Sequence, residues 1–184
     1  MRRTVFLLAL VLALGGCGTT ETGGEPIRPA RPAEPQRAEL GWRESYPAAA
    51  GERLVFEVGM FAVTADGWSA TVAVINRTPF RFEVDPGPAD YGFGLMLFPT
   101  NDLKALEEAN REGLLPAIRE ATTIEPRPPR FLQPRQTWRA MLSAPGSLAE
   151  GSWVRIVFGT FLGADDAPDA FKRVVWFTDR SHRL

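Results

Sequence analysis

The chain has 184 residues, of which 45% are hydrophobic, with a formal net charge of −1 and one cysteine. Proteins that bind nucleic acids usually carry an excess of basic residues, which this near-neutral chain does not have. No nucleic acid is therefore expected as a partner. A single cysteine allows no internal disulfide, and one domain of this size can be stable through packing alone. The 16 prolines and 17 glycines favour strands and turns over a helical bundle.

The N-terminus has the three-part layout of an export signal. Met1-Arg2-Arg3 is a basic start, and an apolar run follows over residues 5–14. This run is shorter than the roughly 20 apolar residues that a membrane-spanning helix needs. Two small residues and the cysteine complete the stretch Leu14-Gly15-Gly16-Cys17. We therefore expect residues 1–16 to be a signal peptide.

The stretch Leu14-Gly15-Gly16-Cys17 resembles the lipobox of bacterial lipoproteins. In that family the cysteine thiol takes a diacylglycerol through a thioether, a signal peptidase cuts directly before it, and the new amine is often acylated. The resemblance implies that Cys17 is the lipidation site and that the mature chain is held on a membrane without a spanning segment. Two acyl chains anchor stably, whereas one binds reversibly. A free thiol near an ordinary cleavage site is the alternative interpretation.

The resemblance also implies a location in the cell envelope, with the domain facing the periplasm or the exterior. Gly18, rather than an aspartate, follows the cysteine, which in that family favours the outer membrane when the host has two membranes. Loss of Arg2 and Arg3 with the signal peptide changes the formal net charge from −1 to about −3. The expected membrane attachment therefore comes from lipid rather than from a basic surface.

Residues 17–38 are predicted to be a lipidated N-terminus followed by a linker. Proline recurs at every third position from Pro26 to Pro35, and large apolar residues are almost absent. Such a segment cannot bury enough surface to offset the entropy of ordering it. We expect an extended spacer, at about 3.1 Å per residue, that leads to one folded domain over residues 39–184.

Apolar alternation predicts a mainly-β domain. The expected strands cover residues 53–63, 68–76, 80–85, 95–98, 136–142, 152–161 and 171–178. Asp66-Gly67 between the first two is a strong hairpin signal. Alternate residues of the second strand should face the core, namely Trp68, Ala70, Val72 and Val74. Seven to eight strands separated by turn signals are typical of an antiparallel β-sandwich.

The stretch Val74-Ile75-Asn76-Arg77-Thr78-Pro79-Phe80 resembles a recurring element of bacterial Ig-like domains, in which a strand runs into an asparagine turn and then into the next strand. The resemblance covers residues 53–85 and implies an Ig-like β-sandwich without implying an activity. Asn76-Arg77-Thr78 is also formally a glycosylation sequon. We favour the turn as the role of this asparagine.

A short helical insert is expected at about residues 101–121. Asn101 is the expected N-cap, Asp102 lies in the favourable first turn, and Gly113 ends the helix. This insert departs from a plain Ig-like pattern. We expect it to cover an edge or an open end of the sandwich.

Two loops contain candidate binding residues. Tyr91 and Phe93 lie among glycines, where aromatic side chains can serve as partner contacts. Packing of these rings back onto the sandwich is the alternative. Residues 163–169 contain three carboxylates that suit Ca²⁺, although their spacing differs from that of an EF-hand loop. A solvated hairpin tip is the favoured interpretation, and no metal site is predicted.

Catalytic signatures are weak. The one histidine, His182, lies close to the chain end, where mobility is usual and a general base is hard to orient. No nucleophile-elbow, zinc-protease or phosphate-loop motif occurs. We therefore expect a non-catalytic binding or scaffold module without a cofactor, whose partner is a protein or another envelope component. The alternatives are a carboxylate-dependent envelope glycan hydrolase and a carrier with an apolar cavity between its sheets.

Overall fold

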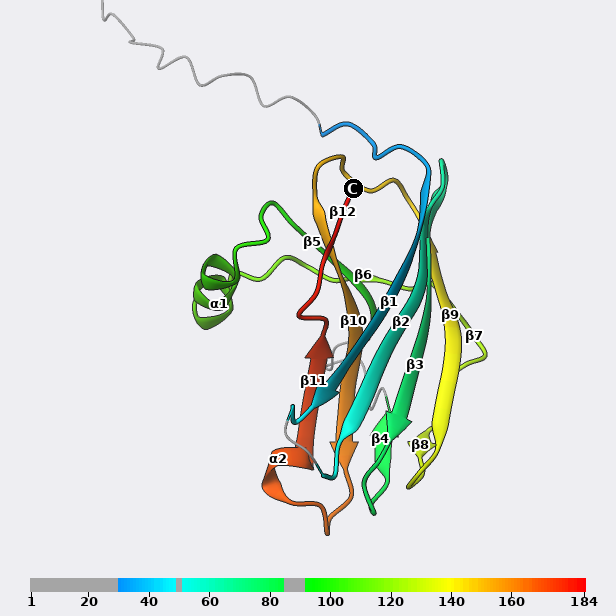
Figure 1. Ribbon diagram of the computed structural model, residues 1–184, viewed down its shortest axis with the longest axis vertical. Coiled ribbons are helices and arrows are strands. Elements are labelled where there is room, and N and C mark those ends of the chain that lie inside the picture. Colours follow the sequence, from blue (N-terminus) through cyan, green and yellow to red (C-terminus); the bar gives the residue numbers. More distant parts are fainter. Residues whose placement is uncertain (1–29, 49–50, 85–91) are drawn as a thin grey trace, which may run out of the picture.

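The structure is a computed structural model that describes residues 30–48, 51–84 and 92–184. Over these ranges it consists of two antiparallel β-sheets, packed face to face, and two short helices (Figure 1). The mainly-β class and the antiparallel β-sandwich predicted from the sequence are confirmed. Cys17 and Tyr91 lie outside the described residues.

The first sheet has the strand order β1-β2-β3-β9-β7. Its strands are β1 (Gln36–Tyr46), β2 (Leu54–Val63), β3 (Gly67–Asn76), β7 (Thr123–Glu125) and β9 (Thr137–Pro145). The predicted hairpin joins β2 to β3, with the Thr64 amide donating to the Gly67 carbonyl at 2.8 Å. The predicted inward residues are each at most 4% exposed, namely Trp68, Ala70, Val72 and Val74.

The second sheet is built around β10, which pairs with β4, β5, β11 and β12. Its strands are β4 (Phe82–Val84), β5 (Phe93–Phe98), β6 (Arg119–Glu120), β8 (Phe131–Leu132), β10 (Trp153–Gly163), β11 (Arg173–Phe177) and β12 (His182–Arg183). The predicted last strand, residues 171–178, is partly wrong because α2 (Asp169–Lys172) takes its first two residues. The ring of Phe171 packs edge-on against Phe80 at 5.1 Å, which draws this turn onto the core.

The likeness to Ig-like domains extends to the two-layer architecture. The strand order differs, because β1, β2 and β3 are consecutive neighbours within one sheet. In the immunoglobulin order, strands B and C, which are consecutive, lie in opposite sheets. Because β1, β2, β3 and β9 are neighbours in this sheet, their outward residues form one broad face.

Aromatic rings fill the space between the sheets. Phe56 lies parallel to Trp176 at 5.2 Å and tilted against Phe158 at 5.0 Å. Phe93 meets Trp138 edge-on at 5.0 Å. Such offset and edge-to-face pairs add to the stabilisation that burial alone provides. These rings occupy the space between the sheets in which a carrier would need an apolar cavity.

The folded domain begins earlier than predicted. Ala33 is 6% exposed, and its amide donates to the Leu148 carbonyl at 2.7 Å. Strand β1 starts at Gln36, which pairs with Val63. The boundary at residue 39 is therefore wrong, and residues 30–38 belong to the sandwich. Proline is tolerated there because the segment enters an edge strand, where missing amide donors are harmless.

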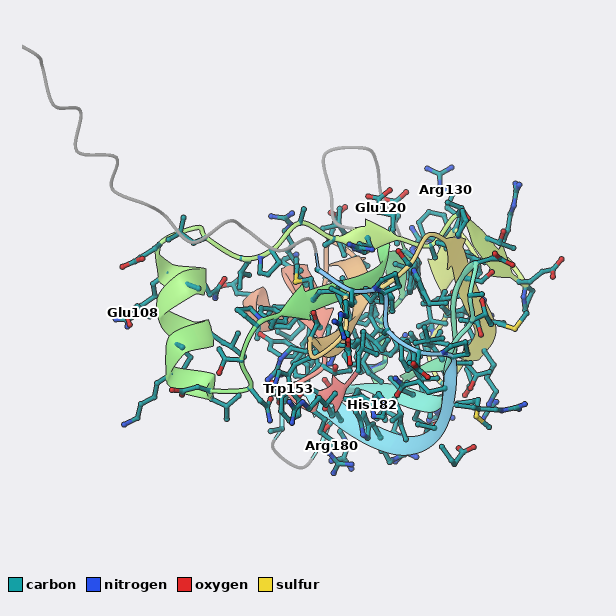
Figure 2. All side chains as sticks on the ribbon, turned by 90° about the horizontal axis from the view of Figure 1, so that it is seen from above. Glu108, Glu120, Arg130, Trp153, Arg180 and His182 are labelled. Carbon is teal, nitrogen blue, oxygen red and sulfur yellow. The ribbon has the colours of Figure 1, made fainter. Side chains whose placement is uncertain are left out.

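The helical insert is confirmed, but its N-cap is not Asn101. In α1 (Leu103–Arg111) the carboxylate of Asp102 accepts the Lys104 amide at 2.9 Å. The Asn101 side chain instead accepts from Arg155 and Ser181. Seen along the long axis, α1 projects from the side of the body, with Glu108 on its outer surface (Figure 2).

A small apolar cluster on the outer face of the second sheet holds this insert in place. Its buried members are Met96, Phe98 and Val157, and the partly buried residues packed on them are Leu106, Leu115, Ile118, Trp153 and Phe177. No residue of α1 itself is buried. The insert therefore rests on the sheet through the segment that follows the helix more than through the helix.

Candidate functional site

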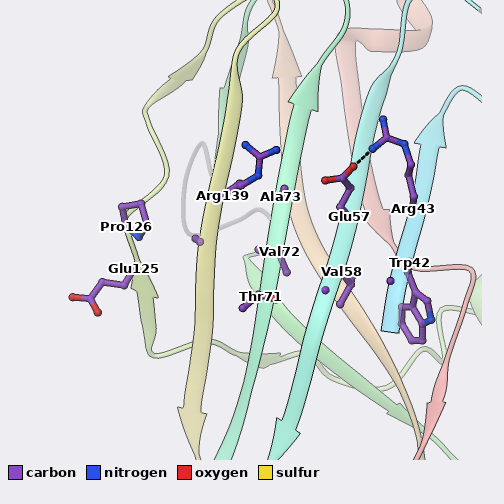
Figure 3. A pocket seen from close by; sticks show the side chains of 13 residues that line it. Trp42, Arg43, Glu57, Val58, Thr71, Val72, Ala73, Glu125, Pro126 and Arg139 are labelled. Carbon is purple, nitrogen blue, oxygen red and sulfur yellow. Dashed lines mark ion pairs between the residues drawn. The ribbon is translucent and has the colours of Figure 1, made fainter. Parts of the chain in front are cut away.

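The outward face of the first sheet is hollowed into an open groove of about 640 Å³ (Figure 3). Cross-strand pairing places Arg43, Glu57, Ala73 and Arg139 in one row across β1, β2, β3 and β9. These side chains share the outward face because strand residues alternate between the two faces. Arginines stand at both ends of this row. The groove is deepest at Ala73, because its side chain is the smallest of the four.

Backbone irregularities deepen this hollow. The β1–β2 pairing shifts register between Glu39 and Trp42, and Gly41 in this bulge has a φ of +56°. Bulges bend and twist a sheet locally, and a positive φ favours glycine. On β2 a Cβ at Gly59 would lie 2.8 Å from the Thr71 hydroxyl, which itself accepts the Met60 amide at 2.8 Å. The floor is therefore made of backbone and small side chains.

Two arginines and two glutamates line the groove, and they are only partly paired. Arg43 is paired with Glu57, as the dashed line shows in Figure 3. Arg139 forms no ion pair with any residue that the structure describes, and its guanidinium lies over Ala73. Glu125, at the far wall, points away from the hollow (Figure 3). The charge left uncompensated inside the groove is therefore that of an arginine.

The far wall of the groove is fixed by one hydrogen bond. The indole N–H of Trp138 donates to the Pro126 carbonyl at 3.2 Å, across from β9 to the end of β7. The indole is buried, so the bond holds the wall against the core. No sequence motif predicts this site. Its residues lie on strands that are far apart in the chain, and only the register of strand pairing brings them together.

The sequence-predicted contact residues do not line this groove. Phe93 is 3% exposed and packs edge-on against Trp138 and Phe161. Its prediction as a partner contact is therefore wrong, and the alternative of packing onto the sandwich holds. The neighbouring glycines suggested that Phe93 belongs to a loop. It is instead the first residue of β5, so its ring points into the core. Tyr91 and the lipidation residue Cys17 lie outside the described residues.

Asn76 has a structural role at the corner between β3 and β4. It is 0% exposed, and its side-chain amide donates to the carbonyls of Phe80, Leu132 and Gln133 at 2.8 to 3.2 Å. Its side-chain oxygen accepts from the amide and the hydroxyl of Thr78. The predicted asparagine turn is thus confirmed, and the side chain is not accessible for glycosylation.

The acidic loop at residues 163–169 is held by the side chain of Lys172, which follows it in the chain. Lys172 donates to the carbonyls of Ala164, at 3.4 Å, and Asp165. Among the described residues, no group of three or more carboxylate, histidine or cysteine side chains is placed to hold a metal ion.

His182 is fixed, contrary to the expected mobility of the chain end. It lies in β12, paired with Val154 of β10, and its Nε2 is 3.0 Å from the Gln36 Oε1. The ring also meets Phe61 at 5.8 Å. Burial lowers the pKa of His182 below its ordinary value of 6.5. The imidazole therefore stays neutral over most of the physiological range and ties the C-terminus to β1.

This pKa shift predicts a pH dependence of stability. Between the lowered native pKa and 6.5, the unfolded chain binds more protons than the native chain at His182. The free energy of unfolding should therefore be unaffected above about pH 6.5 and should fall as the pH drops below it. Urea midpoints of wild type and His182→Gln, compared from about pH 8 to pH 5, measure this contribution as their difference. A difference that stays constant across this range would contradict it.

Comparisons with protein families, curated proteins and solved structures give no match to this chain. The site is therefore interpreted from its own residues. Within the described ranges, no helix has the length and apolar character to cross a bilayer.

Proposed function

We propose that this chain is a lipoprotein of the bacterial cell envelope whose β-sandwich is a non-catalytic binding module. Lipid on Cys17 anchors it to a membrane, the outer one when the host has two. The groove on the outward face of the first sheet meets the partner, a protein or another envelope component with an acidic group. The lipobox-like stretch Leu14-Gly15-Gly16-Cys17 supports the anchor.

The observation that carries the binding role is the groove itself. An outward sheet face needs no hollow for stability, yet here bulges, Gly59 and Ala73 create one beside the unpaired Arg139. A concave surface with apolar walls and a few oriented polar groups is the usual form of a binding site. An acidic group of a partner would pair with Arg139, and apolar parts would cover the floor.

The position of the chain's ends fits this role. The described N-terminal segment lies beside the β9–β10 connection, where the Glu150 amide donates to the Arg31 carbonyl at 2.8 Å. The C-terminus lies at the same end of the sandwich (Figure 1). A tether that enters there leaves the groove and the opposite end of the sandwich open to a partner.

One experiment in intact cells tests both parts of the proposal. Cys17→Ser should move the protein out of the membrane fraction or leave an unprocessed precursor, because two acyl chains supply the anchoring. In the same cells, chemical cross-linking should join the wild-type protein to its envelope partner in a covalent adduct. Ala73→Trp should abolish this adduct, because the indole fills the groove, and should leave membrane attachment unchanged.

Met141→Trp is the matched control for the groove. Met141 is 45% exposed on the same face but does not line the groove. Its substitution should leave the adduct intact. Cys17→Ser protein that is processed to the wild-type size and still fractionates with the membrane would overturn the anchor. Equal adduct yields from both tryptophan variants would overturn the binding surface.

A further inference from the structure

A second, smaller cleft lies on the same outward face, at the end of the sandwich opposite to the described N-terminus. It has a volume of about 210 Å³ and is lined by Arg43, Glu44, Ser45, Arg53, Val55 and Arg77. Ser45 pairs with Val55 across β1 and β2, and the Arg77 amide donates to the Arg53 carbonyl at 2.9 Å. Side chains from three separate segments therefore converge here.

Strand alternation directs Arg43 and Ser45 of β1 to the outward face, where Ser45 lies opposite Val55 of β2. Arg53 directly precedes β2 and Arg77 directly follows β3. Val55 is 2% exposed although it points outward. The neighbouring side chains therefore cover it, as the long aliphatic stems of arginine do when their charged heads stay at the surface.

The cleft has cationic donors in excess of acceptors. The carboxylate of Glu44 is already used, because it accepts the amides of Asp179 and Arg180 at 2.9 and 3.0 Å. Arg53 and Arg77 form no ion pair with the described residues. The Nε of Arg53 is buried and has no hydrogen-bond partner among them. An unpaired buried N–H group costs free energy, so an acceptor that reaches Arg53 would be bound favourably.

We propose that this cleft binds an oxyanion of the phosphate-ester class. Guanidinium groups present a planar fork of donors that matches the oxygens of such a group, and charge-assisted hydrogen bonds are the strongest kind. Ser45, which also lines the cleft, adds a hydroxyl donor. Arg43 lines both the cleft and the groove, so the two meet at this residue. This assignment rests on the proposed binding function and specifies the acidic group of the partner.

Two sources can supply this chemistry, a lipid headgroup or a phosphate ester that is not part of a lipid. The cleft lies at the far end of β1, whose 11 residues span roughly 35 Å from the end where the tether enters. Under the proposed lipid anchoring, the membrane lies beyond the end of the domain that the tether enters. The geometry therefore favours a phosphate ester on a soluble or polymeric envelope component.

The test is a titration of the full mature chain in nonionic detergent with inorganic phosphate, against chloride at constant ionic strength. We expect saturable binding that Arg77→Gln weakens about tenfold, the loss expected for one charge-assisted bond. Arg77 is exposed, so its substitution leaves the core intact. Arg81→Gln is the matched control, because Arg81 is exposed at the same end but lies over the Phe131 ring, outside the cleft.

Arg53→Gln is a second variant, and its urea midpoint separates lost binding from lost folding. Vesicles of phosphatidylcholine with and without phosphatidic acid form the lipid arm. Tighter binding to phosphatidic acid than to free phosphate, also lost in Arg77→Gln, would keep the oxyanion chemistry and overturn the non-lipid source. Absence of saturable phosphate binding, or equal affinities of wild type and Arg77→Gln, would overturn the cleft.

Failure of this inference is distinguishable from failure of the proposed function. Loss of phosphate binding without loss of the groove-dependent adduct would overturn the cleft alone. Phosphate binding that depends on Arg77, in a protein whose adduct survives Ala73→Trp, would overturn the groove alone.

Discussion

Arg155→Ala should lower the free energy of unfolding by about 4 kcal/mol, in the range typical of removing one partner from a buried charged network. Arg155 is 1% exposed, and its Nη1 donates to the carbonyls of Thr178, at 2.7 Å, and Asp179. Its Nη2 donates to the Asn101 side chain at 3.2 Å. The substitution leaves these acceptors without their donor and opens a cavity beside β10.

The positive charge of Arg155 interacts with two nearby carboxylates, those of Asp179 and Glu44. Burial lowers the pKa of its guanidinium, while the carboxylates of Asp179 and Glu44 oppose that effect. The guanidinium also lies 5.7 Å from the centre of the Phe98 ring. Arg155→Lys should recover only part of the loss, because one ammonium cannot reach acceptors on both sides with the geometry of a planar fork.

Hydrogen exchange gives the decisive measurement for Arg155. Amides of residues 101–103 and 178–181 should exchange faster in the variants, because the side chain joins these two connections to β10. Arg127→Ala, at an exposed position between β7 and β8, serves as the control for charge removal. A loss of stability below about 1 kcal/mol would show that the network contributes little.

Asn76→Ala should cost about 4 kcal/mol, at the upper end of single-substitution effects. The side chain is fully buried and satisfies three backbone carbonyls while accepting two bonds from Thr78. Each buried polar group left without a partner costs about 1–3 kcal/mol. Urea unfolding, with the slope unchanged from wild type, measures the loss.

Asn76→Asp separates hydrogen bonding from shape at this corner. Aspartate has nearly the same size, but its carboxylate has no N–H groups for the carbonyls of Phe80, Leu132 and Gln133. We expect a loss at least as large as that of Asn76→Ala. Ser69→Ala, on the outward face of β3, is the control and should change stability by less than about 0.5 kcal/mol. Wild-type stability in Asn76→Asp would refute the role of these bonds.

Local periodicity was enough to predict β2 and β3 and the faces of the residues of β3, whereas β1 was not predicted as a strand. Burial of one sheet face produces alternation that a short window records, as in Trp68 to Val74 of β3. The turn at Asn76 was also predictable, because an asparagine before Arg77-Thr78-Pro79 is a local turn signal. Each of these features depends on residues close together in the chain.

The errors share one cause, which is pairing between distant segments. Residues 36–38 have linker composition, but they form strand because β2 offers them an edge. Phe93 sits beside a glycine loop, but its ring is drawn into the core by Trp138 and Phe161. His182 is near a chain end, yet pairing with β10 fixes it. None of these contacts leaves a local signal in the sequence.

The sequence by itself therefore determined the mainly-β class, the corner at Asn76 and the lipobox-like stretch ending at Cys17, because each depends on a short window of residues. Only the tertiary structure decided where candidate binding surfaces lie. The groove at Arg43, Ala73 and Arg139 depends on the register of four strands, and the cleft at Arg53 and Arg77 depends on how two turns end beside each other. The register of the strands and the closeness of the two turns are set by the packing of the whole sheet. No single segment of the chain contains enough information to predict them.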